Sequence, residues 1–445
     1  MTEFWCERAL VGDVVTSRVS ITVDGGAIVG LRTGTDPRSS ATRLAGIVLP
    51  GFANAHSHAF HRALRGCSQR DRGSFWTWRD VMYEVAARLD PDRYHRLARA
   101  TFAEMVLAGF ASVGEFHYVH HQPDGSPYDD PNAMGEALLA AASEAGIRIT
   151  LLDTLYLHGG LDARGHREVE GVQVRFRDAD ADAWAERVDA LRATPTARIG
   201  AAVHSVRAVD PAGIRVAADW ASAAGAPLHA HVSEQPAENE ACVSAHGASP
   251  TALLADAGAL GERTTAVHGT HLTGADVAAL GTAAVSACIC ATTERDLADG
   301  IGPTDELVAQ GVRLCVGSDS HAVIDPFEEM RAIELDERLR SGRRGTHAAI
   351  DLLRAATVNG HRSLGWEDAG VLAIGARADL VAVRLDSVRT AGVSDDAALE
   401  TAAFAATAAD VTDVVVDGRH LVVDGRHTTI DVATELGEAI WAVLP

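Results

Sequence analysis

The sequence contains no lysine, so all 39 of its Lys and Arg positions are arginine. Schiff-base chemistry, attachment of pyridoxal phosphate and a lysine-containing phosphate loop are therefore excluded, because each needs a lysine amine. The 20 histidines and 61 acidic residues supply the groups that can titrate or bind a metal. We expect the chemistry to depend on imidazoles and carboxylates.

Positive charge and long apolar runs are also scarce. The formal net charge is −22, which argues against nucleic acid or an anionic membrane as a partner. No apolar run approaches the roughly 18 residues that a membrane span needs. Residues 1–10 lack the basic-then-apolar pattern of a signal peptide. These features predict a soluble, cytoplasmic protein.

The six cysteines are scattered, and no CxxC pair is present. Neither a disulfide framework nor a cysteine zinc site is therefore indicated. Buried free thiols are the expected state, because an unpaired cysteine behaves as a small apolar residue.

The order of apolar and Ala-rich segments predicts an α/β fold. Eight apolar runs alternate with helical segments, which is typical of a parallel sheet closed into a barrel. The chain ends contain short strands and turns. We expect a (β/α)8 TIM barrel over residues 49–369 and a small β-sandwich-like domain from residues 1–48 and 370–445. The predicted barrel strands are residues 47–55, 111–116, 147–155, 198–203, 227–231, 264–268, 283–289 and 312–316.

Histidines and an aspartate stand at the ends of several predicted strands. His56 and His58 end the first, and because they are two apart they point to the same side. His231 ends the fifth strand and Asp319 follows the eighth, so all four reach one mouth of the barrel. Three neutral imidazoles and a carboxylate suit zinc better than iron(II) or manganese. We predict a zinc site formed by these four residues.

The surrounding segments resemble the metal-site motifs of the amidohydrolase superfamily, in the branch that contains deaminases. They read PGFANAHSH from residue 50, HVSE from residue 231, VHGTH from residue 267 and GSDSH from residue 317. Residues 355–360 and 375–380 resemble the segments that close the barrel in that family. Many members bridge two metals with a carboxylated lysine, so the absence of lysine implies one Zn²⁺ per chain.

The resemblance also implies catalytic roles. A glutamate three positions after the third histidine ligand, here Glu234, would shuttle protons. His268, after the sixth strand, would polarise the scissile centre or hold the attacking hydroxide. Asp319 would be both a metal ligand and an acceptor for the nucleophilic water. The alternative for Glu234 is a solvated N-cap of the next helix.

Further segments resemble the formiminoglutamate deiminases within this superfamily. The resemblance implies hydrolytic release of ammonia from a small dicarboxylate substrate with an amidine-like head. Arg207 can form a bidentate pair with one carboxylate, and Arg79 can supply a second cation. By the same resemblance, Tyr118 and His204 add hydrogen bonds at the carboxylate end. The segments are residues 58–66, 75–83, 115–121 and 203–209.

His61 departs from that pattern, since members often have Gln there. An imidazole can still hydrogen-bond a polar substrate group, but its charge varies with pH. Two other functions stay open: deamination of a guanine-like or pterin-like ring, and a non-catalytic binding barrel. Aromatic residues make up only 5% of the chain, and every ligand position is filled, so the dicarboxylate hypothesis is favoured. The family also suggests a homodimer.

Overall fold

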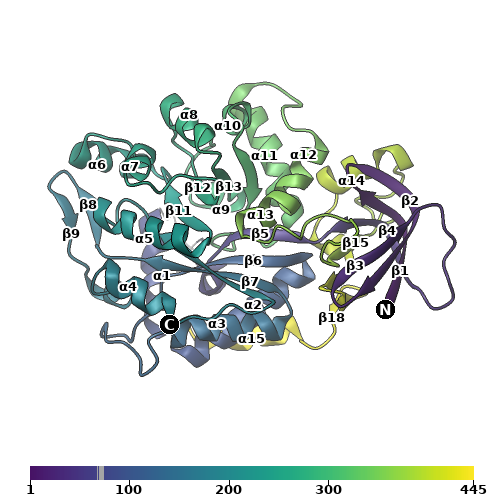
Figure 1. Cartoon of the computed structure of the whole chain (residues 1–445), viewed down its shortest axis with the longest axis horizontal. Coiled ribbons are helices and arrows are strands. Elements are labelled where there is room, and N and C mark those ends of the chain that lie inside the picture. Colours follow the sequence, from purple (N-terminus) through teal and green to yellow (C-terminus); the bar gives the residue numbers. More distant parts are fainter. Residues whose placement is uncertain (68, 70–74, 445) are drawn as a thin grey trace.

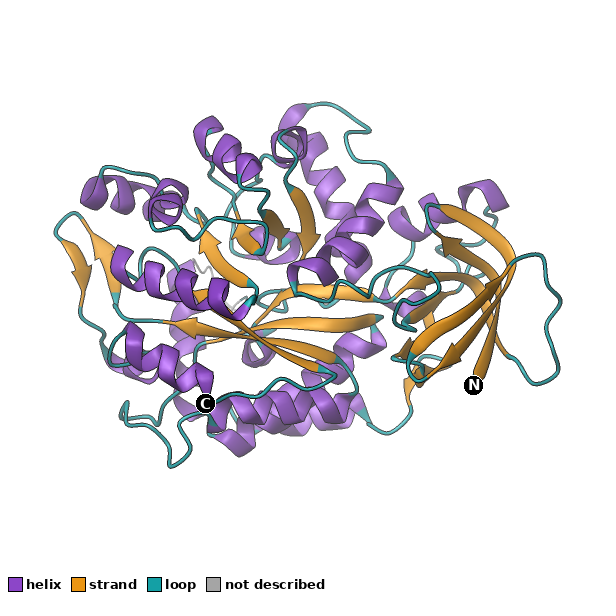
Figure 2. Cartoon of the chain, in the orientation of Figure 1, coloured by secondary structure: helices purple, strands orange, loops and turns teal. Residues whose placement is uncertain are grey.

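The computed structural model describes residues 1–67, 69 and 75–444, which form two eight-stranded sheets, a short hairpin and surrounding helices (Figure 1, Figure 2). One sheet is parallel and forms the barrel. The other, which we call the terminal sheet, is built from both ends of the chain and lies on the right in Figure 1. The predicted fold class is therefore confirmed.

The barrel strands follow one another in sequence order from one edge of the sheet to the other. An isolated parallel bridge between Ser57 and Asp319 joins the two edge strands, so the barrel closes where predicted ligands lie. The strands are β5 (Phe52–Ser57), β6 (Phe110–His117), β7 (Arg148–Leu155), β10 (Ala197–Val203), β11 (Leu228–Val232), β12 (Thr264–His268), β13 (Ser286–Ile289) and β14 (Arg313–Val316).

The terminal sheet pairs an N-terminal strand with a C-terminal one at its centre, where β4 lies beside β15. Its first strand begins at Thr2, so the sheet includes the start of the chain. The predicted domain limits, residues 1–48 with 370–445 and residues 49–369, stay a prediction. The strands are β1 (Thr2–Val11), β2 (Val14–Asp24), β3 (Ala27–Arg32), β4 (Thr42–Pro50), β15 (Leu380–Val383), β16 (Val411–Val416), β17 (Arg419–Val423) and β18 (Arg426–His427).

The single strand predicted over residues 47–55 is wrong, because Gly51 divides it between the two sheets. β4 ends at Pro50 in the terminal sheet, and β5 begins at Phe52 in the barrel. A Cβ atom at Gly51 would lie 2.7 Å from the Cβ atoms of both Ala111 and Asp379. Only glycine therefore fits where the chain passes from one sheet to the other.

A buried ion pair joins the barrel to the terminal sheet. Arg148, the first residue of β7, donates to both carboxylate oxygens of Asp379 and to Asp417. The Arg148 side chain is fully buried, and Asp379 is 1% exposed. Burial opposes charge on Asp379, but Arg148 outweighs it and lowers the pKa of that carboxyl. Removing either partner would leave the other as an uncompensated buried charge.

Helices cover the outside of the barrel, and their ends carry recognisable signals. The Asp210 side chain accepts from the first backbone amides of α5, Pro211 occupies its first turn, and Gly225 ends it at φ 61°. None of the described helices is long and apolar enough to cross a membrane. The helices are α1 (Phe75–Arg88), α2 (Pro91–Leu107), α3 (Ala133–Ala145), α4 (Ala181–Asp189), α5 (Pro211–Ala224), α6 (Pro236–His246), α7 (Pro250–Asp256), α8 (Gly274–Thr282), α9 (Ala291–Asp296), α10 (Thr304–Ala309), α11 (Pro326–Ser341), α12 (Ala349–Arg354), α13 (Gly360–Ser363), α14 (Ala398–Phe404) and α15 (Val432–Trp441).

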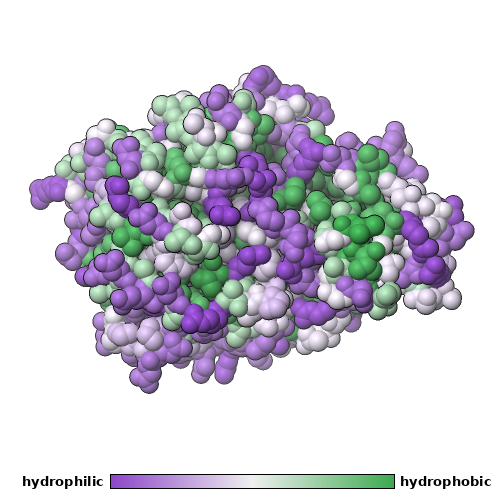
Figure 3. All heavy atoms as spheres, in the orientation of Figure 1, coloured by the Kyte–Doolittle hydropathy of each residue, from purple (hydrophilic) through white to green (hydrophobic). Residues whose placement is uncertain are grey.

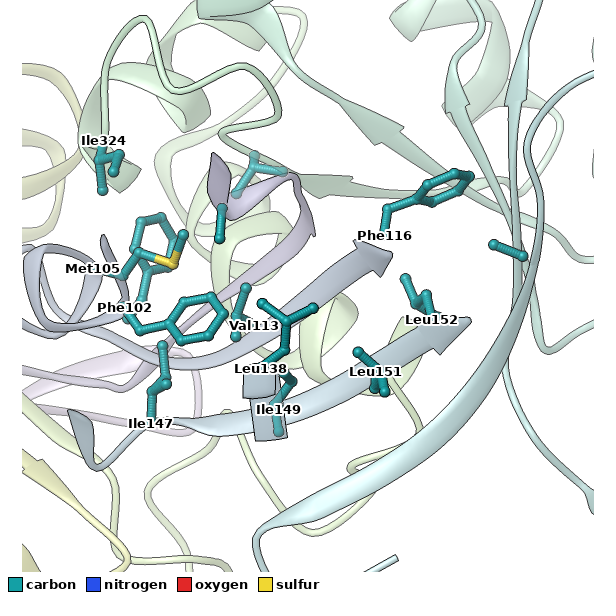
Figure 4. Packing of buried hydrophobic residues seen from close by; sticks show 14 of the residues in the cluster. Phe102, Met105, Val113, Phe116, Leu138, Ile147, Ile149, Leu151, Leu152 and Ile324 are labelled. Carbon is teal, nitrogen blue, oxygen red and sulfur yellow. The ribbon is translucent and has the colours of Figure 1, made fainter. Parts of the chain in front are cut away.

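The main core lies between the barrel strands and these helices. Every residue of β6 is buried, as expected for a parallel strand covered on both faces. Figure 4 shows Phe102, Val113, Leu138 and Ile149 packed side by side. Hydrophilic residues cover much of the face in Figure 3, with an apolar patch over the terminal sheet. The described cysteines are free and all but Cys67 are buried, which agrees with the expected thiols.

Candidate metal centre and active site

Four predicted ligands meet at the barrel mouth. His56 lies in β5, His58 directly after it, His231 in β11 and Asp319 after β14. One potential ligand atom from each lies within 4.8 Å of the other three, and all four residues are buried. The Nε2 atoms of His56 and His231 are 3.1 Å apart. Asp319 Oδ1 is 3.3 Å from the Nε2 atoms of both His56 and His58.

Hydrogen bonds orient two of these imidazoles toward a shared centre. His58 Nδ1 donates to the carbonyl of Phe116 at 2.9 Å, and His231 Nδ1 donates to the carbonyl of His204 at 2.8 Å. Since a carbonyl only accepts, each Nδ1 carries the proton and each Nε2 lone pair faces the centre. This arrangement fits a metal ion bound by three imidazoles and a carboxylate.

The charge states also suit a metal. Burial lowers the pKa of His56 to about 3 and lowers that of His58, so both imidazoles are neutral near pH 7. The pKa of His231 lies well below its usual value for the same reason. Burial would raise the pKa of Asp319, but the hydrogen bond with His56 and the positive charge of His268 hold it well below its usual range. Neutral imidazoles and an ionised carboxylate are the metal-binding forms.

The backbone at the barrel seam fixes Asp319 beside the two β5 histidines. The Asp319 amide donates to the carbonyl of His56 at 3.0 Å, and the His58 amide donates to the carbonyl of Asp319 at 3.3 Å. Asp319 and His268 have φ values of 42° and 69°, in the left-handed region that non-glycine residues avoid. Such strain costs about 1–3 kcal/mol per residue and concentrates at functional sites.

Glu234 and His268 lie beside this centre. His268 Nε2 is 3.8 Å from Glu234 Oε1 and 3.9 Å from Asp319 Oδ2. Burial alone would lower the pKa of His268, but Glu234, Glu294 and Asp319 together raise it to about 10. The alternative for Glu234 is wrong: its side chain is only 9% exposed, and Gln235 occupies the N-cap of α6.

Arg207 contacts carboxylates of the protein itself. Its NH2 donates to Glu234 Oε2 at 3.2 Å, and its Nε lies 3.6 Å from Glu238 Oε2. Glu238 is fully buried on α6, and sequence reasoning missed it. Its position four residues after Glu234, in the first turn of the next helix, was the available signal. Arg207 therefore contacts Glu234, the proposed proton carrier, and is also the residue predicted to bind a substrate carboxylate.

A cavity of about 280 Å³ opens from the metal centre, a size that suits a small molecule. His56 lies outside its lining, beneath the other ligands. The lining contains all the other predicted site residues: His58, His61, Arg79, Tyr118, His204, Arg207, His231, Glu234, His268 and Asp319.

Aromatic and amide groups form the rest of the cavity wall. His61 Nε2 and the Tyr118 hydroxyl are 3.0 Å apart, and burial holds the pKa of His61 well below its usual value, so this imidazole is neutral near pH 7. Gln173 donates to the hydroxyls of Tyr83 at 3.2 Å and Tyr156 at 3.0 Å. Sequence reasoning did not assign these three to the site: Tyr83 lies in one of the segments that carry the resemblance, whereas Gln173 and Tyr156 lie outside those segments. Arg79 lies 5.4 Å from the Tyr83 ring centroid.

Two further groups of potential ligands lie among the described residues, and both are already engaged. In the group of His117, His120 and Asp153, the carboxylate accepts two hydrogen bonds of 2.9 Å from Arg187. The other group contains His268, Cys290 and Glu294, and Glu294 accepts from the Cys290 amide at 2.9 Å. Neither offers an uncompensated carboxylate comparable with Asp319.

Comparison with known proteins identifies the class. Residues 47–421 match the model of the amidohydrolase family, and the chain belongs to this family, as the motifs predicted. It is 39% identical to formimidoylglutamate deiminase of Pseudomonas aeruginosa over 94% of each chain. An 8-oxoguanine deaminase from the same organism is 30% identical over 84% of this chain and 81% of its own. The crystal structure of an amidohydrolase from Brucella melitensis covers 100% of both chains with a TM-score of 0.92 and 32% identity.

Proposed function

We propose that this protein is a zinc-dependent deiminase that hydrolyses N-formimino-L-glutamate to N-formyl-L-glutamate and ammonia, a step in histidine degradation. One observation carries the proposal: a single cavity joins the metal centre and Glu234 to arginines that can bind a dicarboxylate. The 39% identity to a formimidoylglutamate deiminase supports it.

His56, His58, His231 and Asp319 would hold one zinc ion per chain, since their buried donor atoms surround a common point. When bound, zinc lowers the pKa of a coordinated water to about 7 and so supplies a nucleophile at neutral pH. Because the Nδ1 protons of His58 and His231 are bound by backbone carbonyls, these rings need no rotation to bind the metal.

Glu234 and His268 would move and hold protons at the reacting centre. Glu234 accepts a proton from the attacking water and transfers it to the nitrogen that leaves as ammonia. His268 donates a hydrogen bond from Nε2 toward the reacting centre, and its Nδ1 lies 3.3 Å from Glu294 Oε1, which fixes the ring. Asp319 accepts a hydrogen bond from the attacking water.

Arg207, Arg79, Tyr118, His204 and His61 would bind the rest of the substrate. The Tyr118 hydroxyl is held by His61, so it is oriented before the substrate arrives. Arg207 contacts Glu234 as well as the cavity, so its replacement would affect binding and proton transfer together.

The test is a steady-state comparison of ammonia release from N-formimino-L-glutamate, 8-oxoguanine and guanine by the zinc-loaded enzyme. We expect kcat/KM for formiminoglutamate to exceed the other values by at least about 10³-fold, because a site built for charged groups strongly rejects a ligand that lacks them. A preference for either purine would overturn the proposal, and no turnover of any of the three would favour the binding barrel. Homodimer formation stays a prediction.

A further inference from the structure

Among the described residues, three arginines line the cavity, Arg79, Arg167 and Arg207, and their surroundings differ. Arg207 faces two carboxylates of the protein, Glu234 and Glu238. Arg167, at the end of β9, lines the same cavity from another element. Within the described part of the chain, no hydrogen bond or ion pair reaches the Arg167 guanidinium. Its positive charge is therefore available to a ligand.

We propose that Arg167 is a specificity-determining residue that binds the substrate carboxylate farther from the reacting carbon. This inference rests on the proposed function. A substrate with two carboxylates is bound best by separate cationic groups. The charge of Arg207 is already balanced by Glu234 and Glu238. Arg79 lies over the Tyr83 ring. Among the described residues that line the cavity, Arg167 supplies a positive charge that no carboxylate of the protein balances.

The position of Arg167 depends on a glycine in the facing strand. β8 (Gly160–Asp162) and β9 (Gly165–Arg167) form a hairpin in which Gly160 pairs with Arg167. Gly160 also lines the cavity and has φ 150°. A Cβ atom there would collide with the Arg167 guanidinium. The glycine thus leaves the space in which the guanidinium lies across the hairpin toward the cavity.

The hairpin backbone is held in place while the Arg167 side chain is left exposed. His166 Nε2 donates to the carbonyl of Val206 at 3.0 Å, which ties β9 to the loop that carries Arg207. The His166 ring stacks on His158 with centroids 4.4 Å apart. Figure 1 shows the hairpin at the end of the molecule away from the terminal sheet, close to α5 and α6. A fixed backbone with an exposed charged side chain suits capture of an anionic substrate.

The same hairpin offers matched controls. Arg164 is also exposed but does not line the cavity, so Arg164→Met removes the same charge without affecting the proposed contact. Gly165 also has a positive φ, 112°, but a Cβ atom there would meet nothing within 4 Å. Gly165→Ala therefore also places a side chain at a positive φ, but it does not displace Arg167.

The experiment measures ammonia release by Arg167→Met and these three variants with two substrates: N-formimino-L-glutamate, and N-formimino-L-glutamine as the neutral isostere in which an amide replaces the side-chain carboxylate. Arg167→Met should raise KM for the dicarboxylate by about 5- to 20-fold with little change in kcat, as expected for one charged hydrogen-bonding partner at a partly solvated site. It should leave KM for the neutral isostere unchanged. Arg164→Met should match the wild type with both substrates.

Two further readouts separate binding from structural damage. Gly160→Ala should raise KM for the dicarboxylate more than Gly165→Ala does. Added salt should lower the kcat/KM of the wild type more steeply than that of Arg167→Met. Salt screens the attraction between Arg167 and the substrate carboxylate, and the variant lacks that attraction.

The outcomes distinguish the two proposals. If the wild type releases no ammonia from formiminoglutamate, the proposed function fails and the role of Arg167 fails with it. If the wild type is active but Arg167→Met and Arg164→Met have equal KM values, the function stands and the Arg167 assignment is overturned.

Discussion

Replacing Glu234 with Gln tests the proton carrier directly. Glutamine keeps the shape of the side chain but cannot accept a proton at the operating pH. The contact from Arg207 to Glu234 spans 3.2 Å, and Arg207 keeps a second carboxylate, Glu238, at 3.6 Å. Arg207 should therefore stay in place, and the substitution should act on the chemical step more than on substrate binding.

The expected loss follows from the role of Glu234. A positioned general acid–base contributes typically 10²- to 10⁴-fold, so kcat should fall by that factor, or about 3–5 kcal/mol in activation free energy. Glu234 is outside the four-residue ligand group, so the metal content should not change. KM should change by less than about 5-fold, because an interaction used only in the transition state lowers kcat and kcat/KM equally.

The assay follows ammonia release at pH 7 together with elemental analysis of zinc. Glu238→Gln is the matched control, since it removes the other carboxylate beside Arg207 while no ion pair is recorded between Glu238 and His268 or Asp319 among the described residues. Its kcat should fall less than 10-fold by the same reasoning, because no proton moves through it. If Glu234→Gln kept near-normal turnover, or if both variants lost activity equally, Glu234 could not be the proton carrier.

Three other predictions address the metal, pH and stability. Elemental analysis should find one zinc per chain, with loss of zinc from His231→Ala; two tightly bound ions would contradict the single centre. Burial lowers the pKa of His120 and of His361 to about 4. Since the unfolded state then binds more protons than the folded state below about pH 6.5, the free energy of unfolding should fall from pH 6.5 to pH 4, by up to about 3 kcal/mol per histidine. Chemical denaturation across this range checks the sign, and a rise on acidification would refute it. Arg148→Met should lower the free energy of unfolding by about 3–5 kcal/mol, because Asp379 stays buried without its partner; a melting temperature equal to that of wild type would contradict this.

The ligand positions could be predicted because they follow from local rules. The alternation of side chains along a strand places His56 and His58 on one side. The parallel barrel brings strand ends to one mouth, so His231 and Asp319 follow once the strands are recognised. The strands themselves were recognised from short apolar runs, and their order around the sheet is the same as their order in the sequence.

The division at Gly51 could not be predicted in the same way. Residues 47–55 are largely apolar and were interpreted as one strand. The Pro50-Gly51 pair is a local turn signal, but it does not show that the next strand joins another sheet. The reason for glycine there is the approach of Ala111 and Asp379, which are distant in the sequence. The contacts of Arg207 with Glu234 and Glu238 could not be predicted either, because they depend on how α6 packs against the loop after β10.

The sequence by itself determined the fold class, the family, the ligand set that the structure brings together and the need for chemistry without lysine. Each of these depends on residue type, on strand periodicity or on motifs of a few residues. Only the tertiary structure decided that Arg207 faces Glu234 and Glu238, and that Arg167 lines the cavity without a carboxylate partner among the described residues. Side chains from separate loops meet through long-range packing, and local spacing carries no record of those contacts.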